Sequence, residues 1–296
     1  METITFYSYK GGSGRSSTAL NTLPYLVDVL EANKKSPILL LDMDLDSAGM
    51  TYLLGLDKHF QNDTYDIKSF LRAEENWSEN PASSLDEHTF YKKFVPVGEK
   101  LGVENEAVVF LGVDDGKSID NGEMTGDKEV VFTKLDHFCR KNNISAVVID
   151  SSAGDQYSAL LSIQASSVVI NCLRATTQFR IGTFNYLYRL KTKNIDKKII
   201  LLPTVVPIQD RVIDGIQQRQ DAVRDILEKI KALGLDNIKT DFISIDKLGI
   251  NEVERFKWRE GVLYDIGRKQ SLTDDEKEAT ERYSRLAHTI VAGDHE

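Results

Sequence analysis

The feature that most restricts the fold of this chain is a glycine-rich loop between a short strand and a helix. Residues 4–8 are rich in strand-forming side chains, and residues 17–30 carry leucine and valine at helical spacing. Glycines in the intervening segment, residues 10–17, permit backbone angles that turn successive N–H groups inward. Those N–H groups, together with the positive end of the following helix, form a nest for anions. The order strand, loop, helix therefore predicts a phosphate-binding site at the edge of an α/β sheet.

Further along the chain, four continuous apolar runs predict parallel strands. They span residues 37–42, 146–150, 167–171 and 198–203. Continuous rather than alternating apolarity is typical of strands that are buried on both faces, as in a parallel sheet. Helical stretches lie at about residues 128–142, 156–164, 178–192 and 210–233. The alternation predicts an α/β fold with a doubly wound, mostly parallel sheet flanked by helices.

Residues 57–130 interrupt this alternation with a polar and acidic segment, which contains one further apolar strand at 107–112. We interpret the segment as an insertion over the end of the sheet where a ligand binds, within a single domain that spans residues 1–296. The last predicted helix covers about residues 273–292, and Thr273 with Glu276 predicts a capping box at its start.

The loop Lys10–Ser17 departs from the common phosphate-loop pattern G-x-x-x-x-G-K-[ST], because the first glycine is missing and Arg15 replaces the lysine. It matches the deviant Walker A pattern K-G-G-x-G-K-[ST] except at Arg15. The chain therefore resembles the ParA/MinD family of P-loop ATPases, and within that family a branch that carries K-G-G-x-G-R-[ST]. The resemblance covers most of residues 1–56 and 145–270, and it does not cover the insertion.

The resemblance implies roles for the residues of the loop. Lys10 is the signature lysine, which in the family reaches the phosphates of a partner subunit across a nucleotide sandwich dimer. Arg15 keeps the positive charge of a lysine, but its planar guanidinium differs in shape from an ammonium. It either contacts the β- and γ-phosphates or sits differently and slows hydrolysis. The nucleotide-binding residues expected in the loop are Lys10, Gly11, Gly12, Ser13, Gly14, Arg15, Ser16 and Ser17.

The apolar run that ends at Asp42 continues into a segment with two more carboxylates, Asp44 and Asp46. The segment resembles the Walker A′ and switch I region of the family, in which the second carboxylate, here Asp44, positions the attacking water. Carboxylates also close strands and cap turns for structural reasons, and that interpretation stays open here. The catalytic residues that the resemblance implies are Lys10, Arg15 and Asp44.

Another carboxylate, Asp150, follows four apolar residues and resembles Walker B. An aspartate there can hold a Mg²⁺-bound water, and the Ser16 hydroxyl can bind Mg²⁺ beside phosphate oxygens. The metal-binding residues expected are Ser16, Asp44 and Asp150. Gly154 lies in a segment that resembles switch II, where the backbone responds to a γ-phosphate. Because ligands of open α/β sheets bind at the carboxyl ends of the strands, we expect these motifs to share one site.

Two later segments resemble the parts of the family that contact a purine base. Pro203 ends the predicted strand at 198–203 and Thr204 follows it, and both are expected to bind the nucleotide. Phe242–Asp246 resembles a later strand whose end flanks the base. Packing in the core is the alternative explanation for the apolar members of both segments.

The formal net charge of −9 does not favour DNA or an anionic membrane as a partner. No apolar stretch is long enough to span a bilayer, and the N-terminal residues lack the features of a signal peptide. The two cysteines, Cys139 and Cys172, are far apart and have no metal-binding spacing. Together these features predict a cytoplasmic protein with reduced thiols.

The leading hypothesis is a molecular switch that binds ATP and Mg²⁺, forms an ATP-dependent sandwich homodimer, hydrolyses ATP slowly and acts on an unidentified protein partner. By resemblance alone, variant branches of this superfamily accompany bacterial anti-phage or signalling effectors. Two alternatives stay open. One is a regulatory or scaffold module that binds nucleotide without hydrolysing it. The other is a small-molecule kinase or ligase of the same fold, with an acceptor pocket built by the insertion.

Overall fold

The structure, a computed structural model, describes most of the chain. The described residues are 1–60, 66–72, 90–91, 93–114, 128–174, 176–192, 197–206, 215–235, 238–244, 248–250 and 261–292. Within this part of the chain, eight strands form one sheet in the order β3-β4-β2-β5-β1-β6-β7-β8. The strands are β1 (Glu2–Ser8), β2 (Ile38–Met43), β3 (Val95–Pro96), β4 (Val108–Leu111), β5 (Ala146–Ala153), β6 (Val168–Leu173), β7 (Lys198–Pro203) and β8 (Ile238–Lys239).

Burial on both faces explains why the continuous apolar runs form strands. Every residue of β2, β4 and β6 is buried, and all neighbouring strands pair in parallel except β3 with β4. β1 lies in the centre, between β5 and β6. From β1 the chain first builds the side of the sheet that contains β2, and it later adds β6 and β7 on the other side. This reversal places a topological switch point at the carboxyl end of β1, where open α/β sheets bind ligands.

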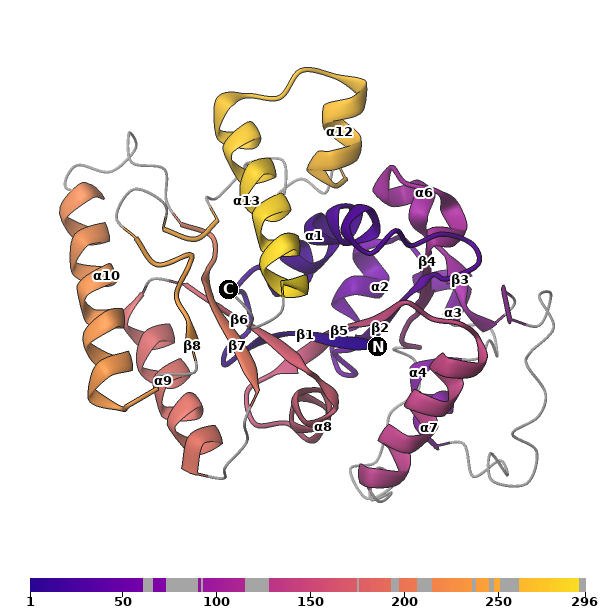
Figure 1. Cartoon of the computed structure of the whole chain (residues 1–296), viewed down its shortest axis with the longest axis horizontal. Coiled ribbons are helices and arrows are strands. Elements are labelled where there is room, and N and C mark those ends of the chain that lie inside the picture. Colours follow the sequence, from indigo (N-terminus) through magenta and orange to yellow (C-terminus); the bar gives the residue numbers. More distant parts are fainter. Residues whose placement is uncertain are drawn as a thin grey trace.

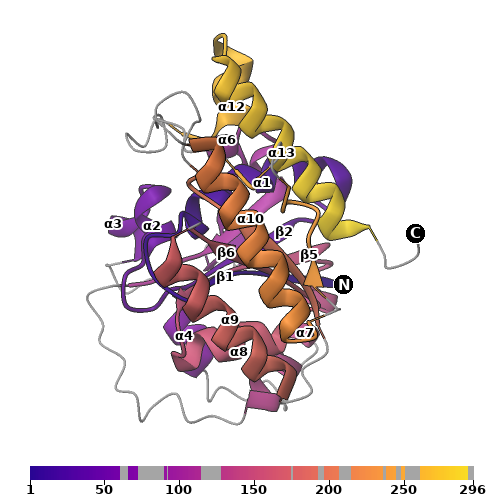
Figure 2. The ribbon, with the colours of Figure 1, turned by 90° about the vertical axis from the view of Figure 1, so that its left-hand side faces the viewer.

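Helices cover both faces of the sheet. They are α1 (Arg15–Val29), α2 (Gly49–Leu53), α3 (Asp57–Phe60), α4 (Ile67–Arg72), α6 (Gly98–Leu101), the 3₁₀ turn η1 (Asn105–Ala107), α7 (Lys128–Lys141), α8 (Tyr157–Ala165), α9 (Thr177–Thr192), α10 (Gly215–Ala232), α12 (Leu263–Lys269) and α13 (Asp274–Val291). Figure 1 shows α1 and α13 on one side of the central strands and α8 on the other. Figure 2 shows α9 and α10 over the end of the sheet that contains β8. The predicted doubly wound, mostly parallel α/β fold is confirmed.

The described parts of the predicted insertion at 57–130 extend one edge of the sheet. β4 pairs in parallel with β2, so that Ile38 lies opposite Val108 and Leu41 opposite Leu111. β3 then adds to β4 in the antiparallel direction. The apolar run at 107–112 therefore forms a buried strand next to β2.

One predicted strand is wrong. Phe242–Asp246 was expected to form a strand, but the strand at this end of the sheet is β8, a few residues earlier. The Ile243 N–H donates to the Thr240 carbonyl at 2.8 Å, which closes a turn directly after β8. Phe242 and Ile243 are buried in two different core clusters, so their apolar character reflects packing from a turn. The rest of that segment, residues 245–246, lies outside the described residues.

The C-terminal part of the described chain packs on α1. α13 begins with the predicted capping box, in which the Thr273 hydroxyl accepts from the Glu276 N–H while the Glu276 carboxylate accepts from the Thr273 N–H. The amide oxygen of Asn21, in α1, accepts from the Leu263 N–H at 2.8 Å. The helix that follows the glycine-rich loop is therefore fastened to the start of α12.

Among the helices that the structure describes, none combines the length and the apolarity needed to cross a bilayer. Both cysteines are buried and unpaired, as the sequence predicts.

Candidate functional site

The glycine-rich loop joins the end of β1 to the start of α1. Gly12 and Gly14 have φ angles of 78° and 76°, in the left-handed region that glycine adopts without steric cost. Gly14 is the N-cap of α1, which begins at Arg15 without a side-chain cap. The first N–H groups of a helix have no partners within it, so an uncapped start of this kind suits a bound anion. Gly11 lies outside the left-handed region, and a Cβ there would meet no other atom.

Residues that follow β7 contact the glycine-rich loop and support it. The Thr204 hydroxyl donates to the Ser13 carbonyl, and Thr204 is only 1% exposed. A Cβ added at Gly14 would come within 3.0 Å of the Cγ2 atom of Val205. Pro203 is the last residue of β7. Thr204 therefore supports the loop through its side chain, while contact of Pro203 and Thr204 with a purine base stays a prediction.

Arg15 points back from the start of α1 to the ends of β2 and β5. Its Nε atom donates to Asp150 Oδ1 at 2.6 Å, and its Nη2 atom donates to Asp44 Oδ2 at 2.7 Å. A weaker contact of 3.4 Å joins Nη1 to the Ser8 hydroxyl. The arginine side chain is 7% exposed, that of Asp44 16% and that of Asp150 0%. In this structure the guanidinium is therefore a buried bridge between two carboxylates that the sequence assigned to one site.

Asp42, in β2, is fully buried and holds the turn that presents Asp44. Its Oδ2 atom accepts from the N–H and the hydroxyl of Thr51, at 2.9 and 2.8 Å, and its Oδ1 atom accepts from the Asp44 N–H at 3.2 Å. Burial and the neighbouring Asp150 carboxylate raise the pKa of Asp42 to about 7, and the Thr51 donors lower it. Asp42 therefore has a structural role, because its carboxylate holds the turn that follows β2.

Asp150, opposite Asp42 in the sheet, keeps one carboxylate oxygen without a partner. Burial raises the pKa of Asp150, while Arg15 and the Ser16 hydroxyl lower it. Its Oδ2 atom is buried and accepts no hydrogen bond among the described residues. Ser16 also lies near the start of α2, since a Cβ added at Gly49 would be 3.5 Å from its Oγ. The three predicted metal-binding residues lie together. Arg15 joins two of them, Asp44 and Asp150, and the third, Ser16, lies beside Asp150.

Lys10 extends in another direction, toward the start of α9. Its ammonium donates to Gln178 Oε1 at 2.8 Å and lies 6.0 Å from the centre of the Phe179 ring. Lys10 is exposed, whereas Arg15 is buried. The two cations of the loop therefore lie in different surroundings: Arg15 faces the strand ends and Lys10 faces the surface.

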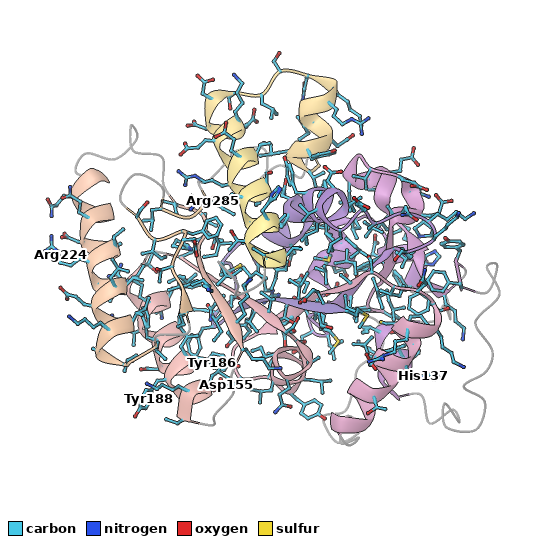
Figure 3. All side chains as sticks on the ribbon, in the orientation of Figure 1. His137, Asp155, Tyr186, Tyr188, Arg224 and Arg285 are labelled. Atoms are coloured by element: carbon cyan, nitrogen blue, oxygen red, sulfur yellow. The ribbon has the colours of Figure 1, made fainter. Side chains whose placement is uncertain are left out.

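The segment after β5 is tied to β1 and α9. Gly154 has a φ angle of 74°, and its N–H donates to the Ser8 carbonyl at 3.0 Å. Asp155 pairs with Arg189 of α9 at 2.7 Å, and both side chains are about half exposed. Asp155 also lies close to Tyr186 of the same helix (Figure 3). The segment that resembles switch II is thus held between the central strand and α9.

A pocket of about 310 Å³ lies beside α1, toward α2, α6 and α12. Apolar side chains form part of its wall, together with Ser17 and Asn21 of α1, Lys100 of α6 and Asp265 of α12. This volume is at the lower end of the range for small-molecule sites. Lys100 belongs to the segment that was expected to build an acceptor pocket for a kinase or ligase. The kinase or ligase alternative stays a prediction, in which this pocket would bind the acceptor.

Three residues that support the site carry no recognisable signal in the sequence. Ser8 contacts Arg15, Thr51 holds Asp42 and Gln178 holds Lys10. Thr51 lies 9 residues after its partner and Gln178 lies 168 residues after its partner, so no fixed spacing could have pointed to either. For Thr51 and Gln178, only the fold shows which residue each one contacts.

No protein-family model matches the chain, and no curated protein matches it. Solved structures do match. A chain of the MinC:MinD cell division protein complex from Aquifex aeolicus is 16% identical, with a TM-score of 0.63 over 100% of this chain and 98% of that chain. McdA of Cyanothece in complex with ATP is 16% identical, with a TM-score of 0.65 over 98% of this chain and 96% of that chain. MinD from Pyrococcus horikoshii with Mg-ADP is 16% identical, with a TM-score of 0.56 over 98% and 96%. At these identities the likeness is one of fold, and the chain has the P-loop ATPase fold of MinD and McdA.

Proposed function

We propose that the protein binds ATP with Mg²⁺ at the carboxyl edge of its sheet, as a switch ATPase of the ParA/MinD family. The observation that carries the proposal is the meeting of Arg15, Asp44 and Asp150 beneath a glycine-rich loop at the start of α1. Arg15 and Asp44 follow β1 and β2, and Asp150 lies in the second half of β5, near the edge where α/β sheets bind ligands. MinD with Mg-ADP and McdA with ATP share the fold, which supports the choice of ligand.

The residues of the site fit a magnesium ion that arrives with the nucleotide. Asp150 Oδ2 is a buried acceptor without a partner in the described part of the chain, and the Ser16 hydroxyl lies beside the same carboxylate. Among the described residues, no three His, Cys, Asp or Glu side chains are grouped to hold a metal alone. Mg²⁺ is commonly bound through one or two carboxylates, and phosphates and water complete its shell. Ser16, Asp44 and Asp150 would hold the ion, which would supply positive charge to the β- and γ-phosphate oxygens.

The other steps belong to the loop and to Asp44. The loop N–H groups and Arg15 would stabilise negative charge on the phosphates. Asp44 is the most exposed of the three carboxylates in the cluster and would orient the attacking water. Its Oδ2 atom accepts from Arg15, so this oxygen can act on water only after that ion pair opens.

The same ion pair supports a second candidate function, a regulatory module that binds ATP without hydrolysing it. While Arg15 occupies Asp44, the carboxylate that hydrolysis needs is neutralised and partly shielded from water. Nucleotide binding through the loop amides does not depend on Asp44. A protein of this kind would use ATP as a structural ligand.

The position of Lys10 supports a sandwich homodimer. Its ammonium is exposed beside the loop and has a neutral amide, that of Gln178, as its hydrogen-bond partner. An ammonium at this surface is free to exchange that amide for the phosphates of a second copy, which are far stronger acceptors. Lys10→Ala should remove the ATP-induced dimer in light scattering, while Lys277→Ala, at an exposed ion pair on α13, should keep it. An unchanged dimer in Lys10→Ala would exclude this role for Lys10.

A protein is the partner class that we propose. The net charge of −9 disfavours nucleic acid and anionic lipid, and MinD of Aquifex aeolicus forms a complex with MinC, a protein. A cytoplasmic location is part of the same proposal, and the two buried cysteines without a disulfide support it.

Two measurements on the purified protein test the proposal. Isothermal titration calorimetry with ATP and Mg²⁺ should show binding, and a phosphate-release assay should show slow turnover. Binding with no released phosphate, alone and with a partner, would establish the non-hydrolysing module instead. Absence of ATP binding would remove both candidates.

A further inference from the structure

The Arg15 guanidinium lies where the proposed site needs a divalent cation. It contacts Asp150 at 2.6 Å and Asp44 at 2.7 Å, through two different nitrogen atoms. These are two of the three side chains expected to bind metal. A cation already bound between two carboxylates competes with a metal ion for the oxygens that it contacts, and its positive charge repels a metal ion at the unpartnered Oδ2 atom of Asp150.

The geometry of this contact depends on an arginine. A guanidinium presents N–H donors in several fixed directions, and here Nε and Nη2 each serve a different carboxylate. An ammonium is a compact charge on a flexible chain, which satisfies one carboxylate more easily than it bridges two. Replacement of the family's lysine by Arg15 therefore turns a loop cation into a bridge.

Burial favours the guanidinium over a free metal ion between the two carboxylates. Arg15 is 7% exposed and Asp150 is fully buried, so little water screens their attraction. A hydrated metal ion would have to lose water and displace a buried guanidinium at the same time. The phosphates of a nucleotide change this balance, because they offer the guanidinium new anionic acceptors and bring their own bound metal.

We propose that, in the nucleotide-free protein, Arg15 takes the place of the divalent cation between Asp44 and Asp150. The metal enters only when the guanidinium has left, so free Mg²⁺ cannot occupy the site in advance of the nucleotide. The inference rests on the proposed nucleotide site for the identity of the displacing anion. The occupancy of the carboxylates by Arg15, however, is testable without any nucleotide.

The test uses Mn²⁺, which substitutes for Mg²⁺ and is detected by electron paramagnetic resonance. The full-length protein is titrated with Mn²⁺ in the absence of nucleotide, as wild type and as Arg15→Met. The variant removes the positive charge and frees Asp44 and Asp150. We expect Mn²⁺ to bind Arg15→Met at least about tenfold more tightly than wild type. Arg189→Met, which removes an arginine from the exposed pair with Asp155, should match wild type.

Equal Mn²⁺ affinity in wild type and Arg15→Met would overturn the proposal, as would tight binding by the wild type. Circular dichroism establishes whether each variant is folded, because Arg15→Met leaves two carboxylates without their counter-ion. If that variant is unfolded, Arg15→Lys decides. A lysine cannot bridge both carboxylates as the guanidinium does, so tighter Mn²⁺ binding than in wild type supports the proposal and unchanged binding overturns it.

A double variant, Arg15→Met with Asp44→Asn, checks that the metal uses the freed carboxylates. It should bind Mn²⁺ more weakly than Arg15→Met alone, and equal affinity would place the metal elsewhere and overturn the proposal. A separate ATP titration of the wild type keeps the two ideas distinct. Failure of ATP binding would refute the proposed function, while the Mn²⁺ result would still decide the role of Arg15.

Discussion

Thr51→Val should destabilise the fold far more than the loss of one hydroxyl from the surface. The Thr51 hydroxyl donates to the buried Asp42 carboxylate at 2.8 Å, and it also accepts from the Val113 N–H at 3.0 Å. Valine has nearly the same shape, so the change removes both hydrogen bonds without leaving a cavity. The same side chain thus supports the turn to Asp44 and the end of β4.

The magnitude follows from these two contacts. Above its raised pKa of about 7, the Asp42 carboxyl is charged, and a hydrogen bond to a charged group contributes roughly 1.5–3 kcal/mol. A buried N–H left without a partner costs roughly 1–3 kcal/mol. Asp42 keeps its bonds from the N–H groups of Thr51 and Asp44, which limits the loss at the carboxylate. We therefore expect the free energy of unfolding to fall by about 3 kcal/mol, near the lower part of the summed range.

Urea unfolding, followed by circular dichroism, measures this loss as a lower midpoint with an unchanged slope. Thr289→Val is the matched control, because its hydroxyl donates to the Arg285 carbonyl at an exposed position of α13. The control should stay within about 0.5 kcal/mol of wild type. A loss below about 1 kcal/mol in Thr51→Val would show that Asp42 does not depend on this hydroxyl.

Three further predictions test other parts of the fold. Gly182→Ala places a Cβ 2.1 Å from the Tyr9 ring, so stability should fall by about 1–3 kcal/mol in urea unfolding; a gain, as alanine gives in an open helix, would contradict this packing. Thr273→Ala removes the capping box of α13 and should cost about 1 kcal/mol in the same assay, and no change would mean that the cap adds nothing. Burial raises the pKa of Cys139 to about 12 and that of Cys172 further, so neither thiol should react with a disulfide reagent at neutral pH until urea is added. Rapid reaction of the native protein would show that one of them is accessible.

Much of the fold was predictable because the strands are buried on both faces. The runs that became β2, β5, β6 and β7 are continuous and apolar, and a strand is the natural structure for such short segments between helical stretches. The turn after β8 was not predictable in the same way. Phe242 and Ile243 are as apolar as strand residues, but they face two separate clusters, which the sequence pattern does not reveal.

The residues of the site could be predicted from the sequence, but the contacts between them could not. The glycines and carboxylates of the motifs do meet at one edge, because parallel strands bring their ends together. The partners of Arg15 could not be predicted, since a cation near a phosphate loop and two carboxylates can bond to either. Burial favours the carboxylates, because little water screens their attraction to the guanidinium. Thr51 and Gln178 were missed because each acts through a neighbour that the fold alone supplies.

The hydrogen bond from the Leu263 N–H to the Asn21 side chain affects how α1 and α12 can move together. α1 starts at the glycine-rich loop, and Asn21 fastens α12 to the side of that helix. Figures 1 and 2 show α12 at the outer end of the molecule. When a helix turns about its axis, a point farther from the axis travels a longer arc. A small rotation of α1 would therefore be enlarged at α12.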